Sequence, residues 1–281
     1  MDKAEFDGCR SILCAPLLRR VDQRLVELLG SLEPEEWDLQ TVAPLWKVRD
    51  VAAHLLDTPL RKLSIVRDGH FPKAAIGSHE DLISFINRLN REGVAMYGRL
   101  SPRVLIDLMQ LACEQSATFH ESLDPFAPAA FAVSWAGEER SLNWFDTARE
   151  LTERWHHQQQ IRLATNRPGI LIRELYHPVL DCFLRGLPHA YRDIEAPVGT
   201  NVLFEVVGEC GGRWLLVRTP KGWSLSGTRE GEYTAQVFIP QEIAWRVFTK
   251  GIDRESARAQ IRIEGDQALG EHVLGLTAIV G

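Results

Sequence analysis

The chain has 281 residues, of which 45% are hydrophobic and 25% are charged. This balance is typical of a folded globular protein, and the length allows one large domain or two ordinary ones. The formal net charge of −6 argues against general nucleic-acid binding, which needs a basic surface.

The sequence contains no sign of a membrane segment. No stretch reaches the roughly 18 uninterrupted apolar residues that cross a bilayer, and arginines bracket the short apolar run near the N-terminus, unlike a signal peptide. We expect a cytoplasmic protein, monomeric or homodimeric, that binds neither nucleic acid nor a membrane. The cysteines are Cys9, Cys14, Cys113, Cys182 and Cys210. Their odd number and the lack of a Cys-x-x-Cys pair predict free, buried thiols.

Apolar residues up to about residue 190 recur at the three- and four-residue steps of amphipathic helices. The predicted helices cover residues 13–29, 48–67, 80–99, 101–123, 143–165 and 172–184. Ser101 followed by Pro102 is a typical helix start. Residues 124–141 contain Pro125, Pro128 and Gly137 and are predicted to form a loop.

After residue 197 the pattern changes to short alternating runs. Strands are predicted at residues 201–207, 213–218, 223–226, 233–239 and 260–264, and short helices at 240–250 and 267–276. The run Thr219-Pro220-Lys221-Gly222 is a hairpin signal. Residues 187–188 and 196–199 are interpreted as a linker. The fold class is therefore α+β with two domains, a helical one over residues 1–196 and a small α+β one over 197–281.

One predicted helix carries two metal-binding side chains. Glu153 and His157 lie four residues apart, so they project from the same side of the helix on consecutive turns. Divalent ions such as zinc accept this mixture of carboxylate and imidazole. A catalytic ion needs a third ligand. His54 is the natural candidate because it lies between apolar neighbours, where an imidazole without a partner is costly.

The same spacing has a second interpretation. Polar residues form one stripe on this helix, and large apolar residues lie opposite them. The stripe consists of Asp146, Glu150, Glu153, His157 and Gln160, and the apolar residues are Trp144, Leu151 and Trp155. A surface helix with a solvated polar face has the same pattern, and His54 would then be an ordinary core histidine. Spacing alone leaves both interpretations open.

Two segments resemble the mycothiol-dependent maleylpyruvate isomerase family. The run from Leu45 to Leu55, LWKVRDVAAHL, is similar to the family motif in which a tryptophan and Val-Arg-Asp lead a helix whose histidine binds metal. Glu153-x-x-x-His157 is similar to the second metal motif of the family. The resemblance implies that His54, Glu153 and His157 hold a divalent ion, with zinc expected and nickel or manganese as alternatives.

The resemblance extends to the rest of the chain. Gln160-Ile161 is similar to the wider DinB-like superfamily, which implies a DinB-like four-helix bundle with extra helices. Residues after 197, ending in the run 263–266 before the last helix, resemble the small sterol-carrier-protein-like α+β domain that these enzymes often carry. The chain departs from the family at Gln158-Gln159-Gln160, where members commonly have an aspartate. His156, next to a ligand, is a candidate for orienting it.

The family resemblance implies an enzyme that uses a low-molecular-weight thiol, such as mycothiol, as co-substrate. In the family the ion favours the thiolate, which adds to an electrophilic carbon. Addition to a conjugated cis double bond, rotation and elimination give isomerisation, whereas retention of the adduct gives S-transfer. We therefore expect a metal-dependent isomerase or transferase that acts on a small electrophilic substrate.

Two alternatives stay open at this point. One is a metal-dependent hydrolase of the same bundle fold, which uses bound hydroxide. The other is a non-catalytic protein whose C-terminal domain binds an apolar small molecule. The residues that would line such a cavity, or else form an ordinary core, are Trp214, Trp223, Phe238, Trp245 and Phe248.

An anionic substrate requires a cation in the site. Arg61 is the first candidate, because it follows His54 by seven residues and lies on nearly the same side of the predicted helix. Further candidates are Arg49 and Arg154 and, since family enzymes also use an arginine of the C-terminal domain, Arg213, Arg218, Arg246 and Arg262. Glu150, one turn before Glu153, is a candidate for a base or for a group that orients a ligand.

Overall fold

The computed structural model describes residues 5–6, 9–71, 78–227 and 231–279 and divides the chain into two compact units. The helical unit contains Cys14–Asp124 and Glu153–Gly169. The sheet-containing unit contains the residues up to Leu13, Pro125–Thr152 and Ile170–Ile279. Helix α5 (Asn143–Ala164) contributes to both. The domain boundary between residues 196 and 197 stays a prediction.

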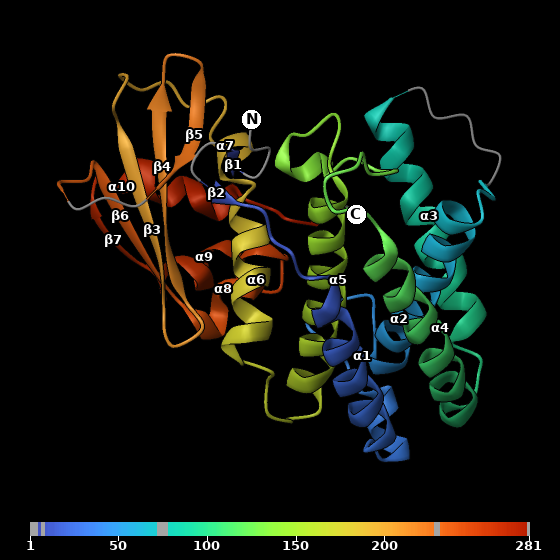
Figure 1. Ribbon diagram of the computed structural model, residues 1–281. Helices are drawn as coiled ribbons and strands as arrows, with labels where there is room; N and C mark the ends of the chain where they lie inside the picture. Colours follow the sequence, from blue (N-terminus) through green and yellow to red (C-terminus); the bar gives the residue numbers. More distant parts are fainter. Residues whose placement is uncertain (1–4, 7–8, 72–77, 228–230, 280–281) are drawn as a thin grey trace. The chain divides into compact units, whose positions relative to one another are not determined.

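The helical unit is built from long amphipathic helices. They are α1 (Ala15–Gly30), α2 (Val48–Lys62), α3 (His79–Tyr97) and α4 (Pro102–Ser122), with the 3-10 turn η1 (Pro34–Asp38) and the π-helical turn η2 (Leu63–Arg67). Helix α1 packs on α4, and α2 packs on both α3 and α4 (Figure 1). The predicted start of α4 is confirmed, because the Ser101 side chain accepts a hydrogen bond from the Val104 N–H.

The spacing of apolar residues explains this packing. Val51, Leu55 and Leu56 of α2 are buried together with Leu25 of α1 and Met109 of α4. In α1 the buried residues Leu18, Val21, Leu25 and Leu28 recur every three or four positions, so this helix buries one continuous side. The helical character of this part of the chain is therefore confirmed.

The sheet-containing unit has a mixed five-stranded sheet among its described residues, in the order β5-β4-β3-β6-β7. The strands are β3 (Asn201–Val207), β4 (Gly212–Thr219), β5 (Gly222–Ser226), β6 (Ala235–Pro240) and β7 (Arg262–Gly265). Strands β3 and β6 are parallel, and the other neighbours are antiparallel. The predicted hairpin between β4 and β5 is confirmed.

Helices of this unit lie on one side of the sheet (Figure 1). They are α6 (Arg173–Leu184), α8 (Gln241–Phe248), α9 (Arg254–Arg258) and α10 (Gln267–Glu271), the last followed by the 3-10 turn η4 (His272–Gly275). Val202, Phe204 and Val206 alternate along β3 and are buried. The predicted α+β class, with a helical region followed by a small mixed sheet, is confirmed.

Five details differ from the prediction. The expected linker at 187–188 is wrong, because Leu187–Ala190 forms the short helix α7, in which Pro188 occupies the first turn, where proline is tolerated. Helix α9 was not predicted, although Asp253 caps it. The predicted last helix is split into α10 and η4. Strands β1 (Glu5–Phe6) and β2 (Cys9–Arg10) pair at the N-terminus, and the loop 124–141 contains the 3-10 turn η3 (Ser134–Ala136).

The thiols agree with the prediction where they are described. Among the described residues, Cys14, Cys113, Cys182 and Cys210 are buried and form no disulfide, and burial raises the pKa of Cys14 to about 12. The side chain of Cys9 lies outside the described part of the chain. Within the described residues, no helix combines the length and apolar character that crossing a membrane requires.

Candidate metal centre

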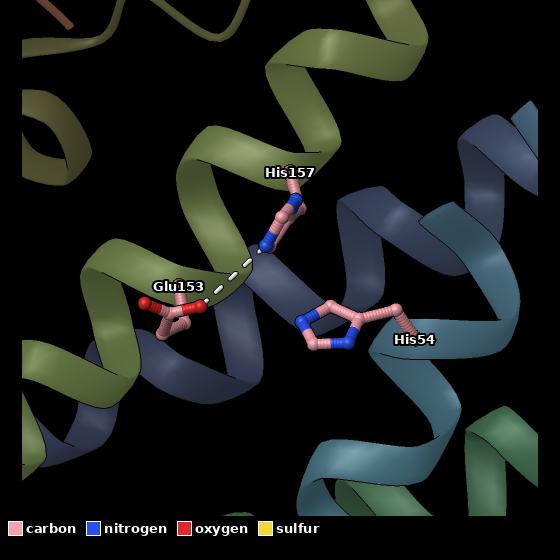
Figure 2. Close-up of side chains that lie close together, drawn as sticks. All are labelled: His54, Glu153 and His157. Carbon is pink, nitrogen blue, oxygen red and sulfur yellow. Dashed lines mark ion pairs between the residues drawn. The ribbon is translucent and has the colours of Figure 1, made fainter. Parts of the chain in front are cut away.

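Three side chains meet in the helical unit. His54 of α2 and Glu153 and His157 of α5 each offer a ligand atom, and these atoms all lie within 4.8 Å of one another. Figure 2 shows the His54 ring pointing across from α2 toward the two side chains of α5. The structure thus brings together the three residues that the sequence predicted as ligands, from helices about a hundred residues apart in the chain.

The start of α2 is well defined. The Asp50 carboxylate accepts a hydrogen bond from the Lys47 N–H at 2.9 Å, which satisfies a free donor at the helix end. Val48, Val51 and Ala52 are buried in the bundle core. This packing fixes the rotation of α2 about its axis and so directs His54, which is itself 4% exposed, toward α5.

The solvated-face interpretation of α5 is wrong. Asp146, Glu150, His157 and Gln160 are all buried, and Glu153 is half-buried. In the helical unit, polar groups of α5 have protein partners. Arg154 donates to Asp22 and to Ser116 Oγ, and Gln158 Nε2 donates to the Val21 carbonyl at 3.0 Å. A helix whose polar side is buried and hydrogen-bonded is consistent with a functional site.

The electrostatics of His54 favour a neutral imidazole. Burial, then the proximity of His157, lowers the pKa of His54 well below its ordinary value, with smaller effects of Arg61 and His156 and an opposing effect of Glu153. Its Nδ1 is buried and has no hydrogen-bond partner among the described residues. A neutral imidazole keeps the lone pair that a metal ligand needs.

A hydrogen bond orients His157. Its Nδ1 lies 2.9 Å from Gln160 Oε1, and its Nε2 lies 3.5 Å from Glu153 Oε2. Because a carbonyl oxygen only accepts, Nδ1 carries the proton in the neutral ring, and Nε2 presents a lone pair toward Glu153. Gln160, within the segment that departs from the family pattern, is therefore the partner that sets the tautomer of this candidate ligand.

The donor set fits a divalent ion. Two imidazole nitrogens and one carboxylate oxygen form a common three-ligand set that leaves positions open for water or substrate. Ligands at about 2.0–2.2 Å from an ion lie at most about 4.4 Å apart. Atoms within 4.8 Å of one another need to move by only a few tenths of an ångström to reach that separation.

Trp46 covers part of this centre. The indole ring lies 4.7 Å from the His54 ring and 5.7 Å from the His157 ring, measured between centroids. The backbone of the preceding loop is held by Gln40, whose Nε2 donates to the Ala43 and Trp46 carbonyls at 2.9 Å. Trp46 entered the sequence prediction only as part of a motif. The spacing of residues along the sequence did not indicate that Trp46 contacts the two candidate histidine ligands.

The other predicted site residues have partners of their own. Arg61 forms an ion pair with Asp57, and Glu150 Oε1 accepts a hydrogen bond from Arg149 at 2.6 Å. Arg49 pairs with Asp38 at the surface. The His156 ring lies 4.0 Å from the His157 ring between centroids, next to the ligand that it was expected to orient.

The predicted residues of the C-terminal part also have local contacts. Each candidate arginine has a partner within the sheet-containing unit: Arg213 with Glu205, Arg218 with the Thr219 carbonyl, Arg246 with the Gly251 carbonyl, and Arg262 with Glu264 and the Phe238 ring. Of the aromatic residues proposed for a cavity, Trp214, Trp223, Trp245 and Phe248 are buried and Phe238 is half-buried. Their burial is that of an ordinary core.

The fold and the candidate metal centre define a helical bundle of the mycothiol-isomerase type. The family model described as the mycothiol maleylpyruvate isomerase N-terminal domain matches residues 18–162, a span that contains all three candidate ligands. The chain therefore belongs to this family.

Solved structures agree at the level of the fold. The chain is similar to the crystal structure of the mycothiol-dependent maleylpyruvate isomerase and to that of a histidine-to-alanine mutant of it. In each case the identity is 12%, the TM-score is 0.50, and the match covers 83% of this chain and 86% of that chain. A comparison with curated protein sequences finds no match.

Proposed function

We propose that this protein is a metal-dependent enzyme that uses a low-molecular-weight thiol, such as mycothiol, for isomerisation or S-transfer on a small electrophilic substrate. The observation that carries the proposal is the convergence of His54, Glu153 and His157 in the domain matched by the family model. These residues would hold the ion, with zinc expected and nickel or manganese as alternatives. A bound divalent cation lowers the pKa of a coordinating thiol, so that a thiolate exists at neutral pH.

The residues around the ligands prepare the site for this chemistry. Gln160 keeps the proton of His157 on Nδ1, away from Glu153. Burial keeps His54 neutral. Trp46 limits the access of water to both imidazoles, and a dry site strengthens the attraction between a cation and a thiolate.

Two further residues have proposed roles in substrate handling. Arg61, on the same side of α2 as His54, is the proposed partner of an anionic group on the substrate. Glu150, whose carboxylate is buried and accepts a hydrogen bond from Arg149, is the proposed base. Neither residue belongs to the proposed ligand set.

The first experiment measures metal and thiol dependence in the same preparation. We expect elemental analysis of the purified protein to find about one equivalent of a divalent ion and His54→Ala to lose it, whereas His70→Ala, a change at an exposed histidine, retains it. We expect maleylpyruvate or a related electrophile to be converted only when mycothiol is added, and the His54→Ala variant to be inactive.

The outcomes separate the alternatives. Conversion without a thiol would favour a metal-dependent hydrolase. A protein without a bound ion, and without a thermal shift on addition of zinc, nickel or manganese, would refute the enzymatic proposal. Full metal content in His54→Ala would refute the ligand assignment.

A further inference from the structure

The two candidate histidine ligands are held in different ways. A histidine that binds a metal usually donates its second ring N–H to an acceptor, which fixes the ring. His157 has such a partner, because its Nδ1 lies 2.9 Å from Gln160 Oε1. His54 has none among the described residues, since its buried Nδ1 forms no hydrogen bond. Figure 2 nonetheless shows the His54 ring directed toward Glu153 and His157, so a contact of another kind is needed to hold it there.

The indole ring of Trp46 supplies such a contact. Its centroid lies 4.7 Å from that of His54 and 5.7 Å from that of His157, with interplanar angles of 43° and 36°. The two imidazoles lie 4.7 Å apart at an angle of 70°. Aromatic rings at such separations attract one another in tilted and edge-on arrangements. The three rings therefore form one packed cluster, in which the flat indole limits the rotation of the His54 ring.

The loop that carries Trp46 turns this side chain inward. Leu45, the residue before it, is 91% exposed, and Pro44 is also exposed. Trp46 is half-buried and packs against the core of the helical unit. Hydrophobicity alone favours burial of either the leucine or the tryptophan. The backbone of the loop therefore decides which of the two side chains faces the metal centre.

Gln40 fixes this backbone. We call residues 40–47 the tryptophan loop. Gln40 Nε2 donates to the carbonyls of Ala43 and Trp46, each at 2.9 Å. The Trp46 N–H donates to the Ala43 carbonyl at 3.0 Å, and Thr41 Oγ1 donates to the Trp46 carbonyl at 2.7 Å. Both backbone polar groups of Trp46 are thus hydrogen-bonded, and this fixes the direction in which its side chain leaves the loop.

We propose that Trp46 positions His54 for metal binding in place of the missing hydrogen bond, and that Gln40 acts by holding Trp46. Both are positioning residues and neither is a ligand. Helix α2, which carries His54, begins at Val48, two residues after Trp46, so the tryptophan loop and the ligand are directly connected. The inference rests on the proposed function, because it concerns the same ion.

Cobalt(II) is the probe that tests this role. Its visible absorption depends on the number and arrangement of its ligands, and its affinity is measured by competition with a chelator after removal of bound metal. We expect Trp46→Ala to weaken the absorption bands and to lower the affinity about 10–100-fold, the range for residues that orient a ligand. Trp46→Phe retains an aromatic ring and should keep the affinity within about threefold of the wild type.

A double-mutant cycle tests whether Gln40 acts through Trp46. Gln40→Ala removes the hydrogen bonds to the loop carbonyls and should lower the cobalt affinity about 3–10-fold. In the Trp46→Ala background the same change should have no further effect, because the side chain that Gln40 positions is already absent. Additive losses in the double variant would overturn the role of Gln40. Because Gln40 is exposed, this variant tests the inference even if Trp46→Ala does not fold.

Two matched controls lie outside the ring cluster. Leu45→Ala changes the neighbouring, exposed residue of the same loop. Gln23→Ala removes an amide that donates to Glu27 Oε1 at 3.0 Å on α1. Both controls should bind cobalt with the affinity and the spectrum of the wild type. Circular dichroism establishes that each variant is folded.

The outcomes separate this inference from the proposed function. A cobalt spectrum and affinity that are unchanged in Trp46→Ala, or changed equally in Leu45→Ala, would overturn the positioning role. A protein that binds cobalt as expected but shows no thiol-dependent turnover would refute the proposed function alone. Absence of cobalt binding in the wild type would overturn both.

Discussion

Replacement of Asp22 by alanine is expected to destabilise the helical unit strongly. Asp22 of α1 accepts a hydrogen bond from the Arg154 guanidinium of α5, and the two residues are only 5% and 3% exposed. Arg154 also donates to Ser116 Oγ at 2.7 Å. Alanine would leave the guanidinium buried without this carboxylate. Breaking a buried ion pair on one side costs about 3–5 kcal/mol.

Urea unfolding followed by circular dichroism measures this loss. With a slope of about 2 kcal/mol per molar urea, the midpoint should fall by roughly 2 M. The exposed pair of Asp38 and Arg49 supplies the control, since Asp38→Ala should move the midpoint little. The double change Asp22→Leu with Arg154→Met removes both charges and should recover most of the stability. A midpoint for Asp22→Ala equal to that of Asp38→Ala would refute the reasoning.

Three further predictions concern the metal centre and the helix packing. Without metal, the free energy of unfolding should fall as pH drops below about 6.5, because the lowered pKa of His54 means that the unfolded chain binds the proton more readily than the folded one. In His54→Asn the urea midpoint should depend less on pH across this range. An unchanged dependence of the midpoint on pH would contradict the prediction. Gln160→Ala should reduce metal affinity, measured in competition with a chelator, by about 10–100-fold, because it removes the hydrogen bond to His157. Gln160→Glu should increase the affinity, and the control Gln23→Ala should leave it unchanged. Equal metal affinities in the wild type and Gln160→Ala would show that this hydrogen bond does not affect metal binding. Gly93→Ala should cost about 1–3 kcal/mol in thermal unfolding, because its Cβ would lie 2.3 Å from a carboxylate of α2. Gly30→Ala, with no atom within 4 Å of its Cβ, should be almost neutral, and similar losses in both variants would refute the steric argument.

Local patterns predicted most secondary structure. Strand β3 has the predicted bounds, and the hairpin after Thr219 follows from its turn residues. Helix α7 was missed because proline was interpreted as a break, although it is compatible with a first helical turn. Helix α9 is a single capped turn, too short to show a period.

Tertiary contacts explain what the sequence could not predict at the site. The polar stripe of α5 has the same spacing whether it faces water or a buried site, so periodicity could not decide between the two. The buried position of Asp57 depends on Gly93 of α3, which meets the Asp57 carboxylate only after the two helices pack. Arg61 was singled out by its distance from His54 along the helix, but its partner Asn90 lies on a different helix, and no local motif connects them.

The placement of the ligands on α2 and α5 has a topological consequence. An ion held by His54, Glu153 and His157 would join two chain segments separated by about a hundred residues, as a cross-link does. The loop that it closes is long, and closing such a loop costs much conformational entropy in the unfolded chain. If the site binds an ion as proposed, metal supply and folding are thermodynamically linked. At a free metal concentration of about 100 times Kd, the loaded fold gains about 2.7 kcal/mol, and a nascent chain can complete the site only after α5 has been synthesised.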